Sequence, residues 1–97
     1  MYAQISTWTY RPEDNDQLER DLAPVFATLR RQPGYVAGYA VDAAADTGVI
    51  VTVWASEPAI DTAFAALTDL HQVVAGRMEL VDRKRGPARN LGPASPA

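Results

Sequence analysis

Residues 49–64, VIVTVWASEPAIDTAF, are the stretch from which the fold can be deduced. Its first six residues are almost all β-branched or aromatic, which favours a strand over a helix. Ser56 then stands at a helix N-cap position, and Pro58 falls in the first turn, where its missing N–H is harmless. Apolar residues follow at helical spacing, at Ile60, Ala63, Phe64 and Leu67. The stretch therefore predicts a strand that turns directly into an amphipathic helix.

The residues before this stretch predict a strand and a helix. The strand is expected over residues 2–10 and ends before Pro12, since proline cannot donate to a sheet ladder. Asp16 and Glu19 then have the spacing of a capping box at the start of the helix. The helix has one apolar stripe, formed by Leu18, Leu22, Val25, Phe26 and Leu29. Pro24 removes one backbone hydrogen bond and should kink or split this helix.

The remaining elements complete a recognisable order. Residues 35–41 form a second strand, which pairs with the third strand, 49–54, as an antiparallel hairpin. The second helix extends over about residues 57–75, and the partly polar residues 77–85 form a fourth strand near an edge. The order βαββαβ predicts an α+β, ferredoxin-like fold, with two helices on one face of a four-stranded antiparallel sheet.

The composition is that of a small globular domain. The chain has 97 residues, which predicts one domain over residues 1–85 and a Pro/Gly-rich tail over 86–97, either mobile or lying as an arm on a partner. The net charge of −3 argues against nucleic-acid binding. The basic residues between 77 and 89 are diluted by Glu79 and Asp82, which favours a solvated strand edge over a phosphate site. Without cysteine, an export signal or a run near the ~20 apolar residues of a membrane span, we expect a cytoplasmic protein without a membrane partner.

The central strands carry no charge on either face, although a sheet with one wet face alternates apolar and charged residues. On the second strand we expect Tyr35 and Tyr39 to share a face. Leaving such a face wet would expose more than the ~300–600 Å² of a typical monomer's largest apolar patch. The sequence therefore predicts a homodimer that packs sheet against sheet.

Motifs around the second and third strands resemble those of a known family. They are Pro33-Gly34-Tyr35, Tyr39, and Trp54-x-Ser56 with Glu57 and Ala59. Through them, roughly residues 1–85 are similar to the antibiotic biosynthesis monooxygenase family, the dimeric α+β barrels. The resemblance implies a substrate pocket between the sheet and the helices of each subunit. It also implies a cofactor-free oxygenase of polyketide anthrones or quinols, a haem-degrading enzyme, or a small dimer with another role.

The haem-degrading branch of this family can be compared residue by residue. That branch has an Asn on the first strand, a second Trp on the second helix and a His further along it. This chain offers Gln4 or Ser6 in place of the Asn and Thr62 near the Trp position. Only His71 lies close to its counterpart. Because two of the three features are missing, the resemblance argues against haem cleavage.

His71 is the single histidine and shares the apolar stripe of the second helix. It is either a boundary histidine with one hydrogen-bond partner or a general base that takes a proton from a phenolic or anthrone substrate. The candidate substrate-binding residues are Gln4, Ser6, Trp8, Tyr39, Trp54 and Arg77. The alternative role of the first five is packing in the sheet or in the dimer interface. Arg77 is either a solvated residue at a strand end or a group that stabilises an oxyanion.

Signals for other chemistries are missing from the sequence. One histidine and no cysteine provide no transition-metal cluster, and there is no glycine-rich phosphate loop. We therefore expect no metal and no cofactor. The hypothesis is a small homodimeric, cofactor-independent monooxygenase acting on a planar, enolisable aromatic or polyketide-type ligand. The alternatives are a non-catalytic ligand-binding or structural dimer, and a polyketide cyclase or isomerase that uses the same base without oxygen.

Overall fold

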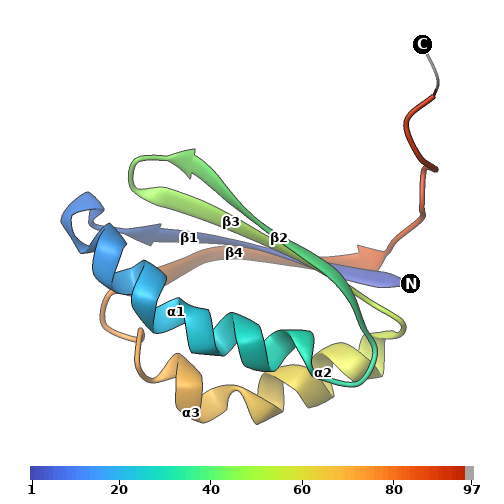
Figure 1. Cartoon of the computed structure of the whole chain (residues 1–97), viewed down its shortest axis with the longest axis horizontal. Coiled ribbons are helices and arrows are strands. Elements are labelled where there is room, and N and C mark those ends of the chain that lie inside the picture. The colour runs from blue at the N-terminus through green and yellow to red at the C-terminus, as the bar shows by residue number, and fades with distance from the viewer. Residues whose placement is uncertain (96–97) are drawn as a thin grey trace.

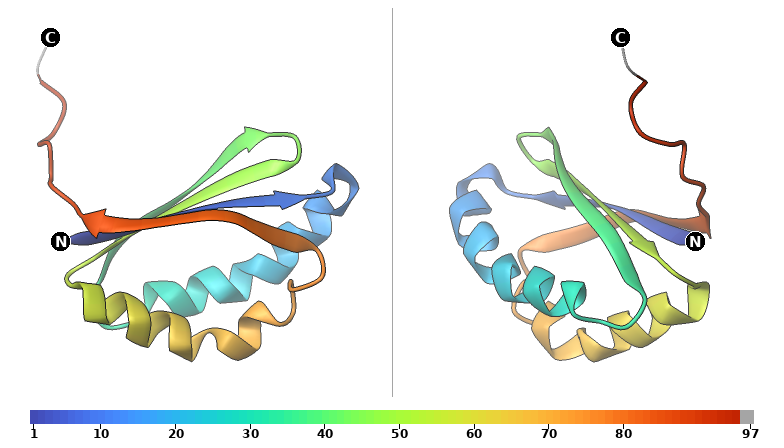
Figure 2. Two further views of the ribbon diagram at one scale, coloured as in Figure 1. Left: turned by 180° about the vertical axis from the view of Figure 1, so that it is seen from behind. Right: turned by 45° about the vertical axis from the view of Figure 1, so that its right-hand side comes forward.

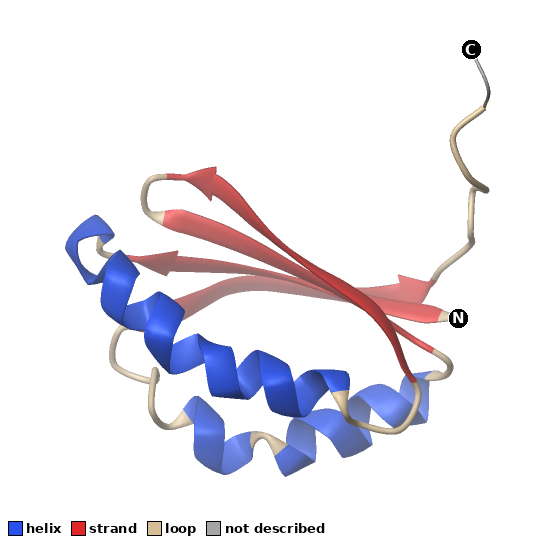
Figure 3. Cartoon of the chain, in the orientation of Figure 1, coloured by secondary structure: helices blue, strands red, loops and turns tan. Residues whose placement is uncertain are grey.

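Four strands form one antiparallel sheet in the order β2-β3-β1-β4, and the helices cover one of its faces (Figures 1 and 3). The structure is a computed structural model that describes residues 1–95. Its elements are β1 (Tyr2–Tyr10), the 3₁₀ turn η1 (Pro12–Asp14), α1 (Asn15–Arg30), β2 (Tyr35–Ala44), β3 (Thr47–Trp54), α2 (Glu57–Ala66), α3 (Thr68–His71) and β4 (Met78–Pro87). This arrangement confirms the predicted α+β, ferredoxin-like fold with β4 at an edge.

The strands extend further than the sequence predicts at three of their ends. β1 has the expected bounds, but β2 continues to Ala44 and β3 begins at Thr47, so the hairpin turn is much tighter than residues 42–48. β4 continues to Pro87, beyond the expected end of the domain at residue 85. Residues 88–95 then lead away from the sheet (Figure 2), and the Ala88 N–H donates to the Met1 carbonyl at 2.9 Å.

α1 begins and continues differently from the prediction. The capping box is wrong, because the N-cap is Asp14, without a side-chain cap, and η1 provides the first turn before it. Of the two effects expected at Pro24, a kink or a split, the split is absent, since α1 is continuous over Asn15–Arg30. Pro24 and Arg20 are both exposed, so the Arg20 carbonyl that loses its helical partner can bond to water.

The second helix starts as predicted but breaks before its expected end. Ser56 is the N-cap, and its Oγ accepts from the Ala59 N–H at 3.4 Å. The helix is interrupted at Leu67, where the N–H bonds to the Phe64 carbonyl in a 3₁₀ pattern and the Thr68 hydroxyl donates to the Ala65 carbonyl. The short α3 then ends at His71, and residues 72–77 form turns instead of helix.

A core lies between α1, α2 and the sheet, at the C-terminal end of β3. Its buried members are Val25, Leu29, Trp54, Ile60, Ala63 and Leu67. The rings of Tyr35 and Trp54 meet edge to face, with centroids 5.4 Å apart and planes at 86°. Each large apolar side chain buried here contributes about 1.5–3 kcal/mol to folding, and together they hold the helices against one half of the sheet.

A β-bulge near the start of β2 reverses one sequence expectation. In the register with β3, Tyr35 pairs with Trp54 but Ala37 pairs with Val53, so Val36 is an extra residue. The expectation that Tyr35 and Tyr39 share a face is therefore wrong. Tyr35 packs against the core, whereas Tyr39 pairs with Val51 on the other side of the sheet.

The face of the sheet opposite the helices is apolar over three strands. Ile5, Tyr39 and Val41 on this outer face are 42%, 65% and 49% exposed. Charged side chains enter this face only from β4, at Glu79, Asp82 and Lys84. The prediction of an uncharged face is confirmed for β1, β2 and β3, while its pairing with a second copy stays a prediction. In the described part of the chain, no helix combines the length and apolarity of a membrane span.

Candidate functional site

Three adjoining cavities lie between the helices and the sheet. The largest is an open cleft of about 500 Å³ between α1 and the β2–β3 hairpin. A side compartment of about 170 Å³ is as open as the cleft, and a chamber of about 40 Å³ is more enclosed. Phe26 of α1 and Ile50 of β3 line all three cavities, so the cavities adjoin one another at those two side chains.

The cleft exists because the sheet twists away from α1. The β2–β3 hairpin diverges from α1 toward its turn, whereas the other ends of β2 and β3 lie close to the helices (Figures 1 and 2). Trp8, Leu22 and Phe26 form apolar walls, and Asn15, Glu19, Arg30 and Asp42 provide polar groups around them. Ligand pockets typically have about 300–1,000 Å³ and mostly apolar walls with few polar groups, and the cleft has this character.

The chamber is lined by unusually polar residues for a protein interior. Gln4, Ser6 and Thr52 are 3%, 6% and 2% exposed, and all three face it from the sheet. Trp8 closes one side, with its indole N–H donating to Ser6 Oγ at 2.9 Å. Sequence reasoning named Gln4, Ser6 and Trp8 as candidate substrate-binding residues, and the structure places them together.

His71 faces the same chamber from the end of α3. Its ring stacks on Phe64, with centroids 6.0 Å apart and an interplanar angle of 29°. Desolvation by its surroundings, and then the positive charge of Arg83, lower the pKa of His71 below its ordinary value of 6.5. The imidazole is therefore neutral near pH 7 and free to accept a proton.

Two arginines of β4 were missed by the sequence analysis. The β1–β4 register places Arg83 opposite Ser6 and Arg85 opposite Gln4, both on the helix-facing side. Arg85 donates to Gln4 Oε1 from Nη2 at 2.9 Å and from Nε at 3.3 Å, and its Nη1 bonds to Asp61 at 2.8 Å. Alternation along β4 could have indicated this pair, but a register shift between Thr7 and Trp8 determines which residues face inward.

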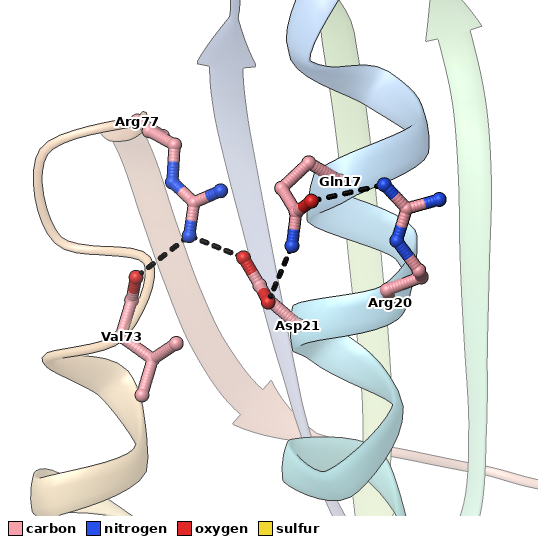
Figure 4. A network of polar contacts seen from close by, with 5 residues as sticks. All are labelled: Gln17, Arg20, Asp21, Val73 and Arg77. Carbon is pink, nitrogen blue, oxygen red and sulfur yellow. Dashed lines mark hydrogen bonds and ion pairs between the residues drawn. The ribbon is translucent and has the colours of Figure 1, made fainter.

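Arg77 belongs to a network of polar contacts with α1 and with the segment before β4 (Figure 4). Its guanidinium donates to Asp21 and to the Val73 carbonyl, and it lines none of the three cavities. Desolvation raises the pKa of Asp21. Hydrogen bonds from Arg77 and Gln17 and the nearby positive charges outweigh this effect, so the pKa lies below its ordinary value. Arg77 therefore ties the segment before β4 to α1, and its predicted oxyanion role has no support in this geometry.

Two aromatic residues that were predicted to contact the ligand do not line the chamber of His71. Trp54 is 0% exposed in the core and borders none of the three cavities, so the interpretation as a sheet-filling aromatic is the one that fits. Tyr39 borders the side compartment, but the residue is 65% exposed and pairs with Val51 on the outer face. Among the predicted site residues, Gln4, Ser6, Trp8 and His71 are the four that the structure brings together.

The fold and the cavity between sheet and helices define a class of protein. The chain belongs to the antibiotic biosynthesis monooxygenase family, whose model matches residues 1–75. It superposes on SnoaB, a cofactor-independent oxygenase from Streptomyces nogalater, with a TM-score of 0.78 and 19% identity over 96% of this chain and 97% of that one. HapK from Hahella chejuensis gives a TM-score of 0.83 and 19% identity over 99% and 100% of the two chains.

A third similar structure is Rv0793 from Mycobacterium tuberculosis. It gives a TM-score of 0.78 and 15% identity over 94% of this chain and 98% of that chain. These structural similarities concern the fold. No curated protein matches the sequence.

Proposed function

We propose that this protein is a small cofactor-independent oxygenase of planar, enolisable aromatic compounds. The observation that carries the proposal is the cleft of about 500 Å³, which adjoins the polar chamber lined by His71. A purely structural protein would need neither the cleft nor buried polar side chains at its inner end. The family and the fold of a cofactor-independent oxygenase support the same choice.

In this proposal the aromatic ring lies in the cleft against Trp8. The neutral His71 takes a proton from the carbon to be oxidised, and the C–H electron pair moves into the ring system to give an enolate. This electron-rich carbanion reacts with dioxygen. One oxygen atom becomes a new carbonyl oxygen on that carbon, and the other leaves as water with the two hydrogens of the original CH₂ group. The reaction thus needs only the substrate, dioxygen and a base.

The proposed functional unit is a homodimer in which the outer faces of two sheets meet. Burying Ile5, Tyr39 and Val41 would remove from water the large apolar side chains that are 42–65% exposed. Apolar area removed from water contributes about 25 cal/mol per Å² before the cost of association. The cleft opens on the helix side, so both sites stay accessible in such a dimer.

Oxygen consumption with anthrone or a hydroquinone tests this function. We expect uptake by the wild type, and a fall of about 10²-fold or more in His71→Gln, because general bases typically contribute 10²–10⁴-fold. Gln72→Ala, next to His71 and exposed, is the control and should retain activity. Unchanged uptake in His71→Gln would remove the histidine from the mechanism. Product formation without oxygen consumption would favour a cyclase or isomerase instead.

A further inference from the structure

The hydroxyl of Thr52 is an unpartnered donor at the inner end of the cavities. The residue is 2% exposed, and within residues 1–95 its Oγ1 has no hydrogen-bond partner. It lines both the chamber and the side compartment. An unpartnered buried hydroxyl costs about 1–3 kcal/mol of folding free energy. A group kept at that cost in a cavity wall is a candidate to bond with a ligand that enters it.

Gln4 provides a second donor beside Thr52. The two residues are direct partners in the β1–β3 register, and such partners have Cβ atoms about 4.5–5.5 Å apart. Arg85 determines which end of the Gln4 amide is available. A guanidinium can only donate, so the amide oxygen must face Arg85, from which it accepts both bonds. The Nε2 amino group is then the end left for the chamber, since the hydrogen bonds of this side chain within residues 1–95 are the two at Oε1.

We propose that Gln4 and Thr52 form a carbonyl-binding subsite, in which Gln4 Nε2 and Thr52 Oγ1 both donate to the carbonyl oxygen of an aromatic ketone. Arg85 is a positioning residue that acts through Gln4, and Asp61 in turn holds Arg85. The chamber has about 40 Å³, which suits a single carbonyl group and not a ring. Most of the ring therefore stays in the cleft, and Phe26 at the boundary must shift to admit the carbonyl together with the ring edge whose carbon His71 deprotonates.

This subsite rests on the proposed function and specifies its substrate class, a ketone whose carbonyl is conjugated to the carbon that loses its proton. When His71 removes the proton, the electron pair of the C–H bond moves onto the carbonyl oxygen and His71 becomes an imidazolium. Donors placed at that oxygen stabilise the enolate more than the neutral ketone. His71 and the donor pair line one chamber, so base and oxyanion site can serve the same substrate molecule.

Binding of 9-fluorenone with a carbon-13 label in its carbonyl tests the subsite. Fluorenone cannot enolise, so its binding is independent of the oxygenase reaction. We expect a downfield carbonyl shift in the wild type, and about 3- to 10-fold weaker binding with a reduced shift in both Thr52→Val and Gln4→Leu, since each loses one hydrogen bond. The exposed Thr62→Val and Gln72→Leu, which make the same chemical changes elsewhere, should behave as wild type.

The positioning role of Arg85 is tested with a double-mutant cycle. If Arg85 acts only by orienting Gln4, then Arg85→Leu weakens fluorenone binding by no more than Gln4→Leu, and the double variant binds no more weakly than Gln4→Leu alone. Additive losses would show that Arg85 acts independently and would overturn this role. A second readout is the NMR signal of the Gln4 side-chain NH₂ group, which should shift when the ligand is added. This shift should depend on Arg85 if Arg85 orients the amide, and not if Arg85 is merely structural.

The outcomes separate this inference from the oxygenase proposal. The subsite is overturned if fluorenone does not bind, or if it binds without a carbonyl shift. It is also overturned if Thr52→Val and Gln4→Leu bind fluorenone as well as the wild type does, whatever oxygen uptake is measured. A shift reduced in both variants supports the subsite. If anthrone and hydroquinone then cause no oxygen uptake, the oxygenase function alone is lost.

Discussion

Replacement of Thr52 by valine should stabilise the protein in the absence of ligand. Thr52 is 2% exposed and its hydroxyl has no partner in the described chain, so the folded state carries the desolvation cost of that hydroxyl. Valine has nearly the same shape and leaves no polar group to satisfy. Removing an unsatisfied buried hydroxyl should recover about 1–3 kcal/mol. At about 4–8 °C per kcal/mol for a domain of this size, the melting temperature should rise by at least ~4 °C.

Thermal and urea unfolding monitored by circular dichroism measure this effect. The urea midpoint should increase with an unchanged m-value, because the surface exposed on unfolding stays the same. Thr62→Val on the exposed side of α2 is the matched control and should change stability by less than ~0.5 kcal/mol. A Thr52→Val protein that is as stable as the wild type, or less stable, would mean that the hydroxyl is satisfied in the folded state. In that case the argument for a donor awaiting a ligand fails.

Three further predictions follow from burial, charge and exposure. Stability should fall as the pH decreases from about 6.5 through the lowered folded-state pKa of His71, because the unfolded chain binds the proton first; His71→Gln should flatten this pH dependence in urea titrations. Trp8→Leu should weaken fluorenone binding about 2- to 10-fold through lost ring contact, and equal affinity would place the ring elsewhere. Tyr39→Glu should dissociate the dimer in sedimentation at micromolar concentration, whereas Val73→Glu, an exposed apolar residue off the sheet, should not; a monomeric wild type contradicts the interface.

The sequence predicted the element order well because local signals agreed with one another. The β-branched run before Trp54 and the Ser56 cap each indicate one structure, and both were confirmed. The errors arose where a local signal competed with the surrounding structure. Asp16 and Glu19 have capping-box spacing, but η1 starts the helix first. The helical stripe that continues to Val74 is interrupted at Leu67 by bonds within the backbone and from Thr68.

The candidate site was predictable only where it depends on alternation within one strand. Gln4, Ser6 and Trp8 are spaced by two residues and therefore share a face in any strand register. The contributions of Thr52 and Arg85 depend on pairing between strands that lie far apart in the sequence. Trp54 shares the helix-facing side of β3 with Thr52, yet it lies over the core and not over a cavity. Alternation identifies the face of a sheet, but not which part of that face stays unfilled.

The register shift in β4 has a consequence for the charge inside the protein. Leu80 pairs with Trp8 but Asp82 pairs with Thr7, so Val81 is one residue more than the ladder needs. In an unshifted ladder Asp82 would stand opposite Ser6 and Lys84 opposite Gln4, which would bring a carboxylate next to the chamber of His71. The register shift thus places two arginines, Arg83 and Arg85, where an unshifted ladder would place one acidic and one basic side chain. The pairing register of β4, and not its composition alone, therefore determines the charge beside His71.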